Sequence, residues 1–298
     1  MNNSCLFCSS LSIKPFKLPK NVFNDKEFNY FRCESCLLVS INPIPSETDL
    51  EKMYPPSYQQ GVSKELTDAD QKLPGLRFSY KFLFTTLMNE GKHKTIVDFG
   101  CGNGRFIYNA LQHDLKINGV EFSETQVKNL KNEIPQVLFQ TVVEFFEDEM
   151  VYDIIFMSNV LEHFTNPRQE FSRLLKKLKP GGIVLIEGPL EMNTSLVNKF
   201  KWMYFKVRLA LNKNYTTAHA PTHIFFSNHS NQLEFFKRHV LKTELFKVVE
   251  NTWPYPESIR DARGIVEKVK AIIAKCSIVL CSLNKNWGNT FIYVGRKD

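Results

Sequence analysis

A glycine-rich turn is the part of the sequence best suited to hold a small ligand. It reads DFGCGNG over residues 98–104 and follows a short apolar run that starts at Thr95. Glycine lets a backbone approach a ligand closely and adopt positive φ angles. A helix that starts after such a turn points its free N–H groups toward the ligand. We therefore expect a nucleoside to bind here, against Asp98, Phe99, Gly100, Cys101, Gly102 and Gly104.

The spacing of the glycines narrows the choice of nucleoside. Gly100, Gly102 and Gly104 follow the pattern GxGxG. A dinucleotide-binding motif, GxGxxG, would need its third glycine at the position that Arg105 occupies. The spacing therefore favours S-adenosylmethionine over NAD.

An acidic residue in the next predicted strand supports this interpretation. Glu121 ends that strand, in the stretch GVEFS, and a carboxylate there can accept hydrogen bonds from both hydroxyls of a ribose. The alternative is that Glu121 caps the following helix. Ser123 and Gln126 already form a capping-box pattern, so the helix does not need it. We assign Glu121 to the cofactor, together with Phe122.

Two CxxC pairs near the N-terminus have the spacing of metal ligands. Together they complete the tetrahedral sulfur shell that structural zinc prefers. Such a shell has no open position, so we expect a structural site and not a catalytic one. The alternative, a redox-active CxxC, would need only one pair, placed after a strand. The predicted zinc ligands are Cys5, Cys8, Cys33 and Cys36.

The elements that must position these residues are visible as short apolar runs alternating with helical patterns. Such alternation is typical of a parallel sheet covered by helices on both faces. Ligands bind at the carboxyl ends of the strands in such a sheet, which is where the glycine turn lies. We predict an α/β, Rossmann-like sheet, mostly parallel, of about seven strands. The predicted strands lie near 95–99, 117–121, 137–141, 153–158, 182–187 and 290–294, and the helices near 76–90, 104–114, 123–132 and 167–178.

Five motifs, in this order, resemble the class I S-adenosylmethionine-dependent methyltransferases. They are DFGCGNG, GVEFS, YDII, VLEH and LKPGG, and they span about 90–190. In that family, the residues matching the glycine turn line the methionine and ribose of the cofactor, and the residue matching Glu121 binds the ribose hydroxyls. The loop after the third strand flanks the adenine. The resemblance therefore implies methyl transfer, and Val143, Ser158 and Asn159 join the expected cofactor site.

The N-terminal segment is similar to a zinc-ribbon leader of bacterial methyltransferases in sugar and surface-polysaccharide synthesis. The similarity rests on the two CxxC pairs, on NPIP at 42–45 and on LEKMY at 50–54. It implies that the methyl acceptor is a hydroxyl of a sugar or glycan intermediate, either nucleotide- or lipid-linked. We predict a zinc-ribbon-like domain at 1–45, a linker with helices at 46–92, and a methyltransferase domain at 93–298 with a substrate-side insertion at 190–228.

His163 is the expected catalytic base. An alcohol is a poor nucleophile at neutral pH, so a base that takes its proton helps. Glu162 can orient His163 or hold it charged, and the equivalent Glu-His pair lies at the active site of the resembling sugar enzymes. The alternative is a buried structural histidine. Quinone-type O-methyltransferases of the family bind a metal with an extra acid three residues before that glutamate. Asn159 stands there in this chain, which argues against a catalytic metal.

Two further histidines, His219 and His223, lie between the fifth strand and the next helix. Insertions there cover the substrate side of this fold, and His223 resembles the histidine of a recurring H-x-x-x-F-S stretch in the family. We expect one of the two to bind substrate. The alternative is packing against Phe225 and Phe226. Tyr58, in the proline-rich linker, is also assigned to the substrate.

The stretch 196–215 combines large apolar residues with five Lys or Arg residues. A basic, aromatic helix can lie on an anionic membrane or grip a diphosphate. The alternative is a lid helix with an apolar inner face and a solvated outer face. Peripheral contact with the inner face of the membrane is therefore one expectation for this stretch.

Composition and charge limit which partners and which cellular location the protein can have. The net charge of +7 comes from Lys and Arg interleaved with Asp and Glu, which argues against a nucleic-acid partner. We see no run of about 18 apolar residues and no secretory signal, so we expect a cytoplasmic protein. Two alternatives stay open: O- or C-methyl transfer to a small metabolite, and a non-catalytic zinc-ribbon module whose methyltransferase domain is degenerate.

Overall fold

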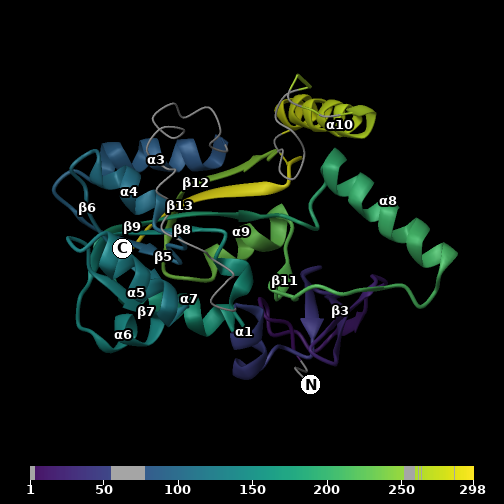
Figure 1. Cartoon of the computed structure of the whole chain (residues 1–298), viewed down its shortest axis with the longest axis horizontal. Helices are drawn as coiled ribbons and strands as arrows, with labels where there is room; N and C mark the ends of the chain where they lie inside the picture. The colour runs from purple at the N-terminus through teal and green to yellow at the C-terminus, as the bar shows by residue number, and fades with distance from the viewer. Residues whose placement is uncertain (1–3, 55–77, 252–258, 261, 263, 285) are drawn as a thin grey trace.

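The chain folds around two β-sheets, one of seven strands and one of six. The computed structural model describes residues 4–54, 78–251, 259–260, 262, 264–284 and 286–298. Tyr58, one of the predicted substrate residues, lies outside the described residues. The larger sheet occupies the centre of the molecule, and the smaller one lies at the N-terminal side beneath it (Figure 1).

The central sheet has the strand order β12-β13-β9-β8-β5-β6-β7. Six of its strands run in the same direction, and β13 runs against them, because it pairs antiparallel with both β9 and β12. The fold class predicted from the sequence is confirmed. The strands are β5 (Thr95–Phe99), β6 (Lys116–Glu121), β7 (Phe139–Thr141), β8 (Tyr152–Ser158), β9 (Leu178–Pro189), β12 (Lys242–Val249) and β13 (Thr290–Arg296).

Helices cover both faces of this sheet, because its inner strands are apolar on both sides. One core holds side chains of α3, α4 and α5, and a second holds those of α6, α7 and α9. The helices of the first core are α3 (Phe78–Glu90), α4 (Arg105–Leu111) and α5 (Glu124–Glu133). Those of the second are α6 (Val142–Glu147), α7 (Pro167–Lys176) and α9 (His229–Lys237).

The smaller sheet is built from two distant parts of the chain. Its N-terminal strands are β1 (Ile13–Pro15), β2 (Lys20–Phe23), β3 (Lys26–Cys33) and β4 (Val39–Asn42). Residues Asn24 and Asp25, both with positive φ, form the tight turn of the β2–β3 hairpin. Two short strands of the predicted insertion complete the sheet: β10 (Thr216–Thr217) pairs with β2, and β11 (Phe225–Phe226) with β4.

This shared sheet fixes the N-terminal unit against the rest of the protein. Phe7 packs on Phe225 of β11 and on Phe235 of α9, with ring centroids 4.8 Å and 4.4 Å apart. Helix α1 (Glu47–Met53) follows, with a capping box between Ser46 and Asp49. The domain boundaries at 45 and 92 stay predictions. The described buried side chains of the first unit belong to the same core as those of α6, α7 and α9.

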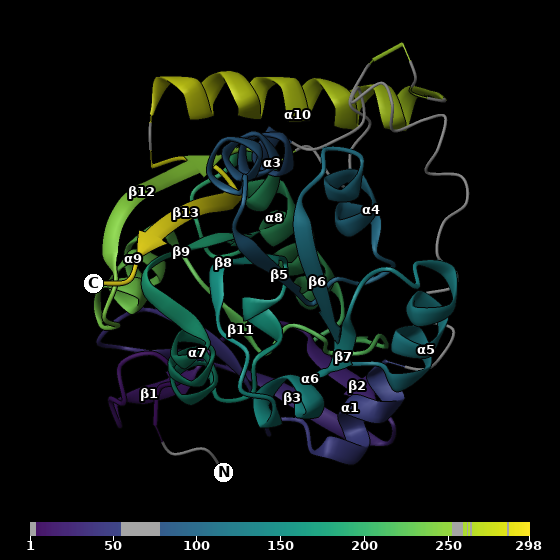
Figure 2. The ribbon, with the colours of Figure 1, turned by 90° about the vertical axis from the view of Figure 1, so that its left-hand side faces the viewer.

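Two further helices lie at the periphery of the molecule. Helix α8 (Leu196–Leu211) belongs to the predicted insertion, and α10 (Gly264–Leu283) precedes the last strand. They contact each other, since the backbone N–H of Leu196 donates to Oγ of Ser277 over 3.2 Å. Figure 2 shows α10 lying across the end of the molecule opposite to the N-terminal sheet.

Candidate active site

The glycine turn connects β5 to α4, and its shape depends on residues without a side chain. Gly100, Gly102 and Gly104 have φ angles of 83°, 58° and 76°. Residues with a Cβ rarely adopt such angles. A Cβ on Gly100 would also lie 2.4 Å from Cγ2 of Val160, in the segment after β8. The backbone therefore passes close to this segment. Within the turn, the N–H groups of Gly100 and Cys101 both donate to the carbonyl of Val120 at the end of β6.

Glu121 holds the turn in place from the end of β6. Its Oε2 accepts a hydrogen bond from the backbone N–H of Gly102 over 2.9 Å, and its Oε1 accepts one from Ser123 over 3.3 Å. The Ser123 hydroxyl itself caps α5 by accepting from the backbone N–H of Gln126. Burial raises the pKa of Glu121, although the carboxylate still reaches the wall of a cavity.

This first cavity has a volume of about 410 Å³, within the range of ligand sites. A carboxylate beside a glycine turn, with aromatic walls around it, suits a nucleoside that has ribose hydroxyls and a flat base. Seven predicted cofactor residues line the cavity: Phe99, Gly100, Gly102, Glu121, Phe122, Ser158 and Asn159. The donor set present therefore fits S-adenosylmethionine.

Four other predicted cofactor residues do not line this cavity. Asp98 and Cys101 are buried, and burial together with the charge of Glu121 raises the pKa of Asp98. Gly104 supports the turn from the start of α4. The side chain of Val143 is 65% exposed, whereas its neighbour Val142 lines the cavity.

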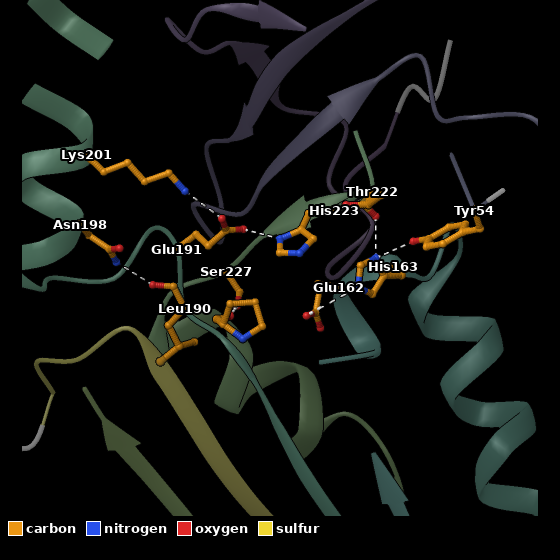
Figure 3. A network of polar contacts seen from close by, with 11 residues as sticks. Tyr54, Glu162, His163, Leu190, Glu191, Asn198, Lys201, Thr222, His223 and Ser227 are labelled. Atoms are coloured by element: carbon orange, nitrogen blue, oxygen red, sulfur yellow. Dashed lines mark hydrogen bonds and ion pairs between the residues drawn. The ribbon is translucent and has the colours of Figure 1, made fainter. Parts of the chain in front are cut away.

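His163 lies at the edge of the first cavity, in a short 3₁₀ turn after β8 (Figure 3). Its Nδ1 is 2.8 Å from the hydroxyl of Tyr54 and 2.8 Å from the backbone carbonyl of Thr222. A carbonyl can only accept, so Nδ1 carries the proton and Nε2 keeps its lone pair. Burial and then the charge of His223 lower the pKa of His163 to about 4. His163 is therefore a neutral imidazole at pH 7.

Glu162 stands next to the free nitrogen of this imidazole. Its Oε1 is 3.9 Å from Nε2 of His163 and has no hydrogen-bond partner among the described residues. Burial raises the pKa of Glu162 to about 7. A carboxylate in this position stabilises a positive charge on His163 once the ring accepts a proton.

The second histidine, His223, belongs to a partly exposed series of paired charged groups. Its Nδ1 is 2.9 Å from Oε2 of Glu191, whose Oε1 accepts from Nζ of Lys201 over 3.1 Å (Figure 3). Burial by itself lowers the pKa of His223, but the charge and hydrogen bond of Glu191 outweigh it and raise the pKa to about 9. His223 is therefore protonated at pH 7, and its ring centroid lies 5.0 Å from that of His163.

A second cavity of about 280 Å³ opens on the other side of His223 and Glu191. It lies between the N-terminal sheet, α8 and the segment 217–226, and both His219 and His223 line it. Asn21 of β2 is fully buried in its wall, and its Nδ2 has no hydrogen-bond partner among the described residues. Aromatic side chains form much of the remaining wall: Tyr30, Trp202, Phe205 and Phe226.

The four N-terminal cysteines come together as predicted. The Sγ atoms of Cys5 and Cys36 are 3.5 Å apart, those of Cys8 and Cys33 are 3.6 Å apart, and all four lie within 4.8 Å of one another. The hydrogen bond from Cys36 lowers the pKa of Cys5 to about 5, and a thiolate is the form that binds metal. The arrangement fits a four-sulfur structural zinc site.

A second group of ligating atoms meets at the active site. One atom each from Glu162, His163 and His223 lies within 4.8 Å of the others. Asn159, at the position where quinone-type enzymes have an acid, donates to Oγ of Ser158 over 3.2 Å. The expectation that catalysis needs no metal is not tested by this geometry and stays a prediction.

Comparison with known proteins identifies the family. A family model described as a methyltransferase domain matches residues 76–235, more than half of the chain. This chain belongs to that methyltransferase family. The match includes the ends of β5 and β6, which line the first cavity, and the segment that carries Glu162 and His163. The enzyme therefore uses S-adenosylmethionine. Membership of this family also argues against the alternative that the chain is a non-catalytic zinc-ribbon module with a degenerate methyltransferase domain.

The curated relatives of this methyltransferase are distant. The ubiquinone biosynthesis O-methyltransferase of Rickettsia typhi is 24% identical over 208 residues, which are 68% of this chain and 73% of the relative. The protein of the same name from Rickettsia bellii is 24% identical over 176 residues, 57% of this chain and 64% of the relative. This methyltransferase therefore spans less than two thirds of the length of the second relative.

Solved structures support the fold. A chain in the complex between the Haloferax volcanii Trm112 methyltransferase activator and the putative methyltransferase superposes with a TM-score of 0.50 at 15% identity. The superposition covers 73% of this methyltransferase and 87% of that chain. It shows the same Rossmann-like architecture and nothing of the substrate.

Three residues of the methyltransferase site were not predicted from the sequence. Tyr54 ends α1 and reaches across to His163 and to Phe122, whose ring centroid is 5.7 Å away. Glu191, in the turn after β9, and Asn21, in β2, line the second cavity. No local motif marks them. The one available signal was the LEKMY stretch, which contains Tyr54 but was interpreted as part of a linker.

Proposed function

We propose that this methyltransferase methylates a hydroxyl of a sugar or glycan intermediate, with His163 as the general base. The observation that carries the base assignment is the hydrogen bonding of Nδ1, which leaves Nε2 unprotonated at the edge of the first cavity. S-adenosylmethionine supplies an electrophilic methyl group on a sulfonium sulfur.

The chain's own residues would hold the acceptor and take its proton. S-adenosylmethionine would supply the methyl group, and Nε2 of His163 would take the proton that the acceptor hydroxyl loses. Glu162, 3.9 Å away, stabilises the imidazolium that results. Tyr54 and Thr222 keep the ring in one orientation, which matters because methyl transfer needs an in-line approach.

The second cavity supports a polar acceptor with several hydroxyls. Nδ2 of Asn21, which has no partner among the described residues, can donate to such a hydroxyl, and Glu191 is a nearby acceptor. Flat aromatic walls suit the C–H face of a sugar ring. The contact between the rings of His163 and His223 brings this cavity next to the base.

A panel assay tests this proposal. The purified enzyme is incubated with S-adenosylmethionine and nucleotide sugars, and products are analysed by mass spectrometry. We expect one added methyl group on a sugar hydroxyl, and we expect Asn21→Leu to raise KM without weakening cofactor binding. Methylation confined to acceptors without a sugar would contradict the proposal.

A second candidate is O-methylation of a small phenolic metabolite. It is favoured by the two Rickettsia relatives, which are named ubiquinone biosynthesis O-methyltransferases, and by the aromatic walls of both cavities. Catechol acceptors in the same assay separate the two candidates. Turnover of catechols, with none of nucleotide sugars, would select this one.

A further inference from the structure

The outer helices α8 and α10 carry most of the exposed large hydrophobic side chains in the described part of the chain. Among the described residues, twelve of the twenty exposed large hydrophobic side chains lie on these two helices. Ile265 and Leu283 of α10 are 82% and 78% exposed, and Leu211 of α8 is 81% exposed. Apolar patches of this kind on a folded protein mark interaction sites.

Helix α10 turns its apolar side away from the protein. Its buried residues are small, namely Ala271, Ala274 and Ser277. A surface helix ordinarily buries its large apolar residues and exposes its polar ones. In α10 the exposed stripe, at alternating spacings of four and three residues, consists of Ile265, Val269, Ile272, Cys276, Val279 and Leu283.

Helix α8 has the same organisation next to it. Its buried residues, Val197 and Asn198, face the protein, and Trp202 and Phe205 line the second cavity. The exposed stripe follows a helical period and consists of Phe200, Met203, Tyr204, Val207 and Leu211. Figure 1 shows both helices at the edge of the molecule, and they contact each other.

The charge of these helices is strongly positive. Helix α8 contains four cationic residues and no acidic one, and α10 contains three lysines against one glutamate. Their net charges, +4 and 3 − 1 = +2, add up to +6, while the whole chain carries +7. The lysines of α10, Lys268, Lys270 and Lys275, are exposed beside the apolar stripe.

We propose that the outer faces of α8 and α10 dock on an anionic lipid bilayer. An interfacial helix binds such a surface by burying apolar side chains while Lys and Arg meet the lipid phosphates. Among the described residues, no helix is long and apolar enough to cross a membrane, so the contact is peripheral. Because α8 also lines the second cavity, docking holds that cavity next to the bilayer.

The charges favour a bilayer over a second copy of the chain. The four-three spacing on α10 would also suit helix pairing. In such a pair, Lys268 and Lys275 flank the stripe and would meet cationic residues of the other copy, with Glu267 as the one acid of the helix. An anionic bilayer can pair its phosphates with the lysines and bury the apolar stripe at the same time.

Vesicle flotation tests the proposal without any methyl acceptor, so its outcome is independent of the proposed substrate. The full chain is mixed with phosphatidylcholine vesicles that do or do not contain phosphatidylglycerol. We expect flotation with the anionic vesicles and little with the neutral ones, and a decrease as salt screens the charges.

Two triple variants identify the surface. Replacing Val269, Ile272 and Val279 by Ser, or Lys268, Lys270 and Lys275 by Gln, should each lower the partition coefficient by at least about tenfold. The matched controls change the same residue types elsewhere on the surface and should stay within about twofold of the wild type. They are Leu11, Met150 and Val240 to Ser, and Lys128, Lys237 and Lys242 to Gln.

Three results would overturn the proposal. One is a wild type that does not float with phosphatidylglycerol vesicles. Another is flotation that neither triple variant weakens, with thermal melting showing that both are folded. The third is a dimer in light scattering that the Ser variant converts to a monomer, because a second copy would then cover the surface.

Discussion

At the scale of single residues, the proposed catalysis depends on how the two nitrogens of the His163 imidazole are used. Nδ1 of His163 is occupied by a backbone carbonyl and a tyrosine hydroxyl, and Nε2 stays free beside Glu162. This is the arrangement that a general base needs, because it fixes both the tautomer and the ring orientation.

Removing the imidazole should stop catalysis while leaving the cofactor bound. We expect His163→Ala to lose roughly 10²–10⁴ in kcat, the usual contribution of a general base. Calorimetry should show unchanged affinity for S-adenosylmethionine, because Glu121 and the glycine turn remain. A variant that turns over at the wild-type rate would remove His163 from the mechanism.

The tyrosine from α1 should have a smaller effect. Tyr54→Phe keeps the ring against Phe122 but removes the hydroxyl that contacts Nδ1 of His163. One lost hydrogen bond corresponds to about a fivefold decrease in kcat, and KM for the cofactor should not change. Tyr204→Phe, on the exposed side of α8, is the matched control. If the two variants behave alike, Tyr54 has no part in positioning the base.

The rate should rise with pH around the pKa of Glu162. Burial raises that pKa to about 7, so the carboxyl is protonated below this pH and ionised above it. Since the ionised form stabilises the imidazolium, kcat should increase as the pH passes through about 7. Glu162→Gln should be slow, with no such rise. A variant profile identical in shape to that of the wild type would exclude Glu162 as the titrating group.

Some of the site residues could be predicted from the sequence, and others could not. Glu121, His163 and the glycines belong to motifs within a few residues of strand ends, so local patterns located them. Tyr54 contacts a residue 109 positions away, and Asn21 contacts the insertion 198 positions away. Contacts over such distances follow from tertiary packing, which a local pattern does not record.

At the scale of elements, the strands of the central sheet were predictable because each is a short apolar run buried on both sides. Helix α10 and strand β12 were not located in advance. The apolar residues of α10 face outward, so its pattern does not reflect burial in the core. Strands β10 and β11 have two residues each and form only by pairing with the N-terminal sheet.

The four-cysteine cluster should stabilise α1 and, through it, the active site. We expect Cys33→Ser to lose bound zinc and to lower Tm by at least about 5 °C, or about 2 kcal/mol in a chain of this size. Activity should fall too, because Leu50 of α1 and Tyr54 at its C-terminal end line the first cavity. Cys276→Ser, at an exposed free cysteine, is the control. Full activity in a zinc-free variant would show that the cluster does not support the site.

At the scale of the whole molecule, the N-terminal residues and the insertion enclose a site that is built on the shared methyltransferase sheet. The family match covers 76–235, so α1, the cysteine cluster and α10 lie outside it. Leu50 and Tyr54 of the α1 region line the first cavity, and β2 and β3 of the N-terminal sheet line the second; the insertion joins that sheet through β10 and β11. Acceptor specificity is therefore expected to reside in these additions more than in the shared sheet.

The most direct test of the central claim is calorimetric titration with S-adenosylmethionine. The wild type should bind one equivalent, and Glu121→Ala should weaken binding by about 1–3 kcal/mol, because the carboxylate is the proposed partner of the ribose hydroxyls. Melting curves establish that the variant is folded. Absence of binding to the wild type, or equal affinity in the variant, would contradict the assignment of this cavity to the cofactor.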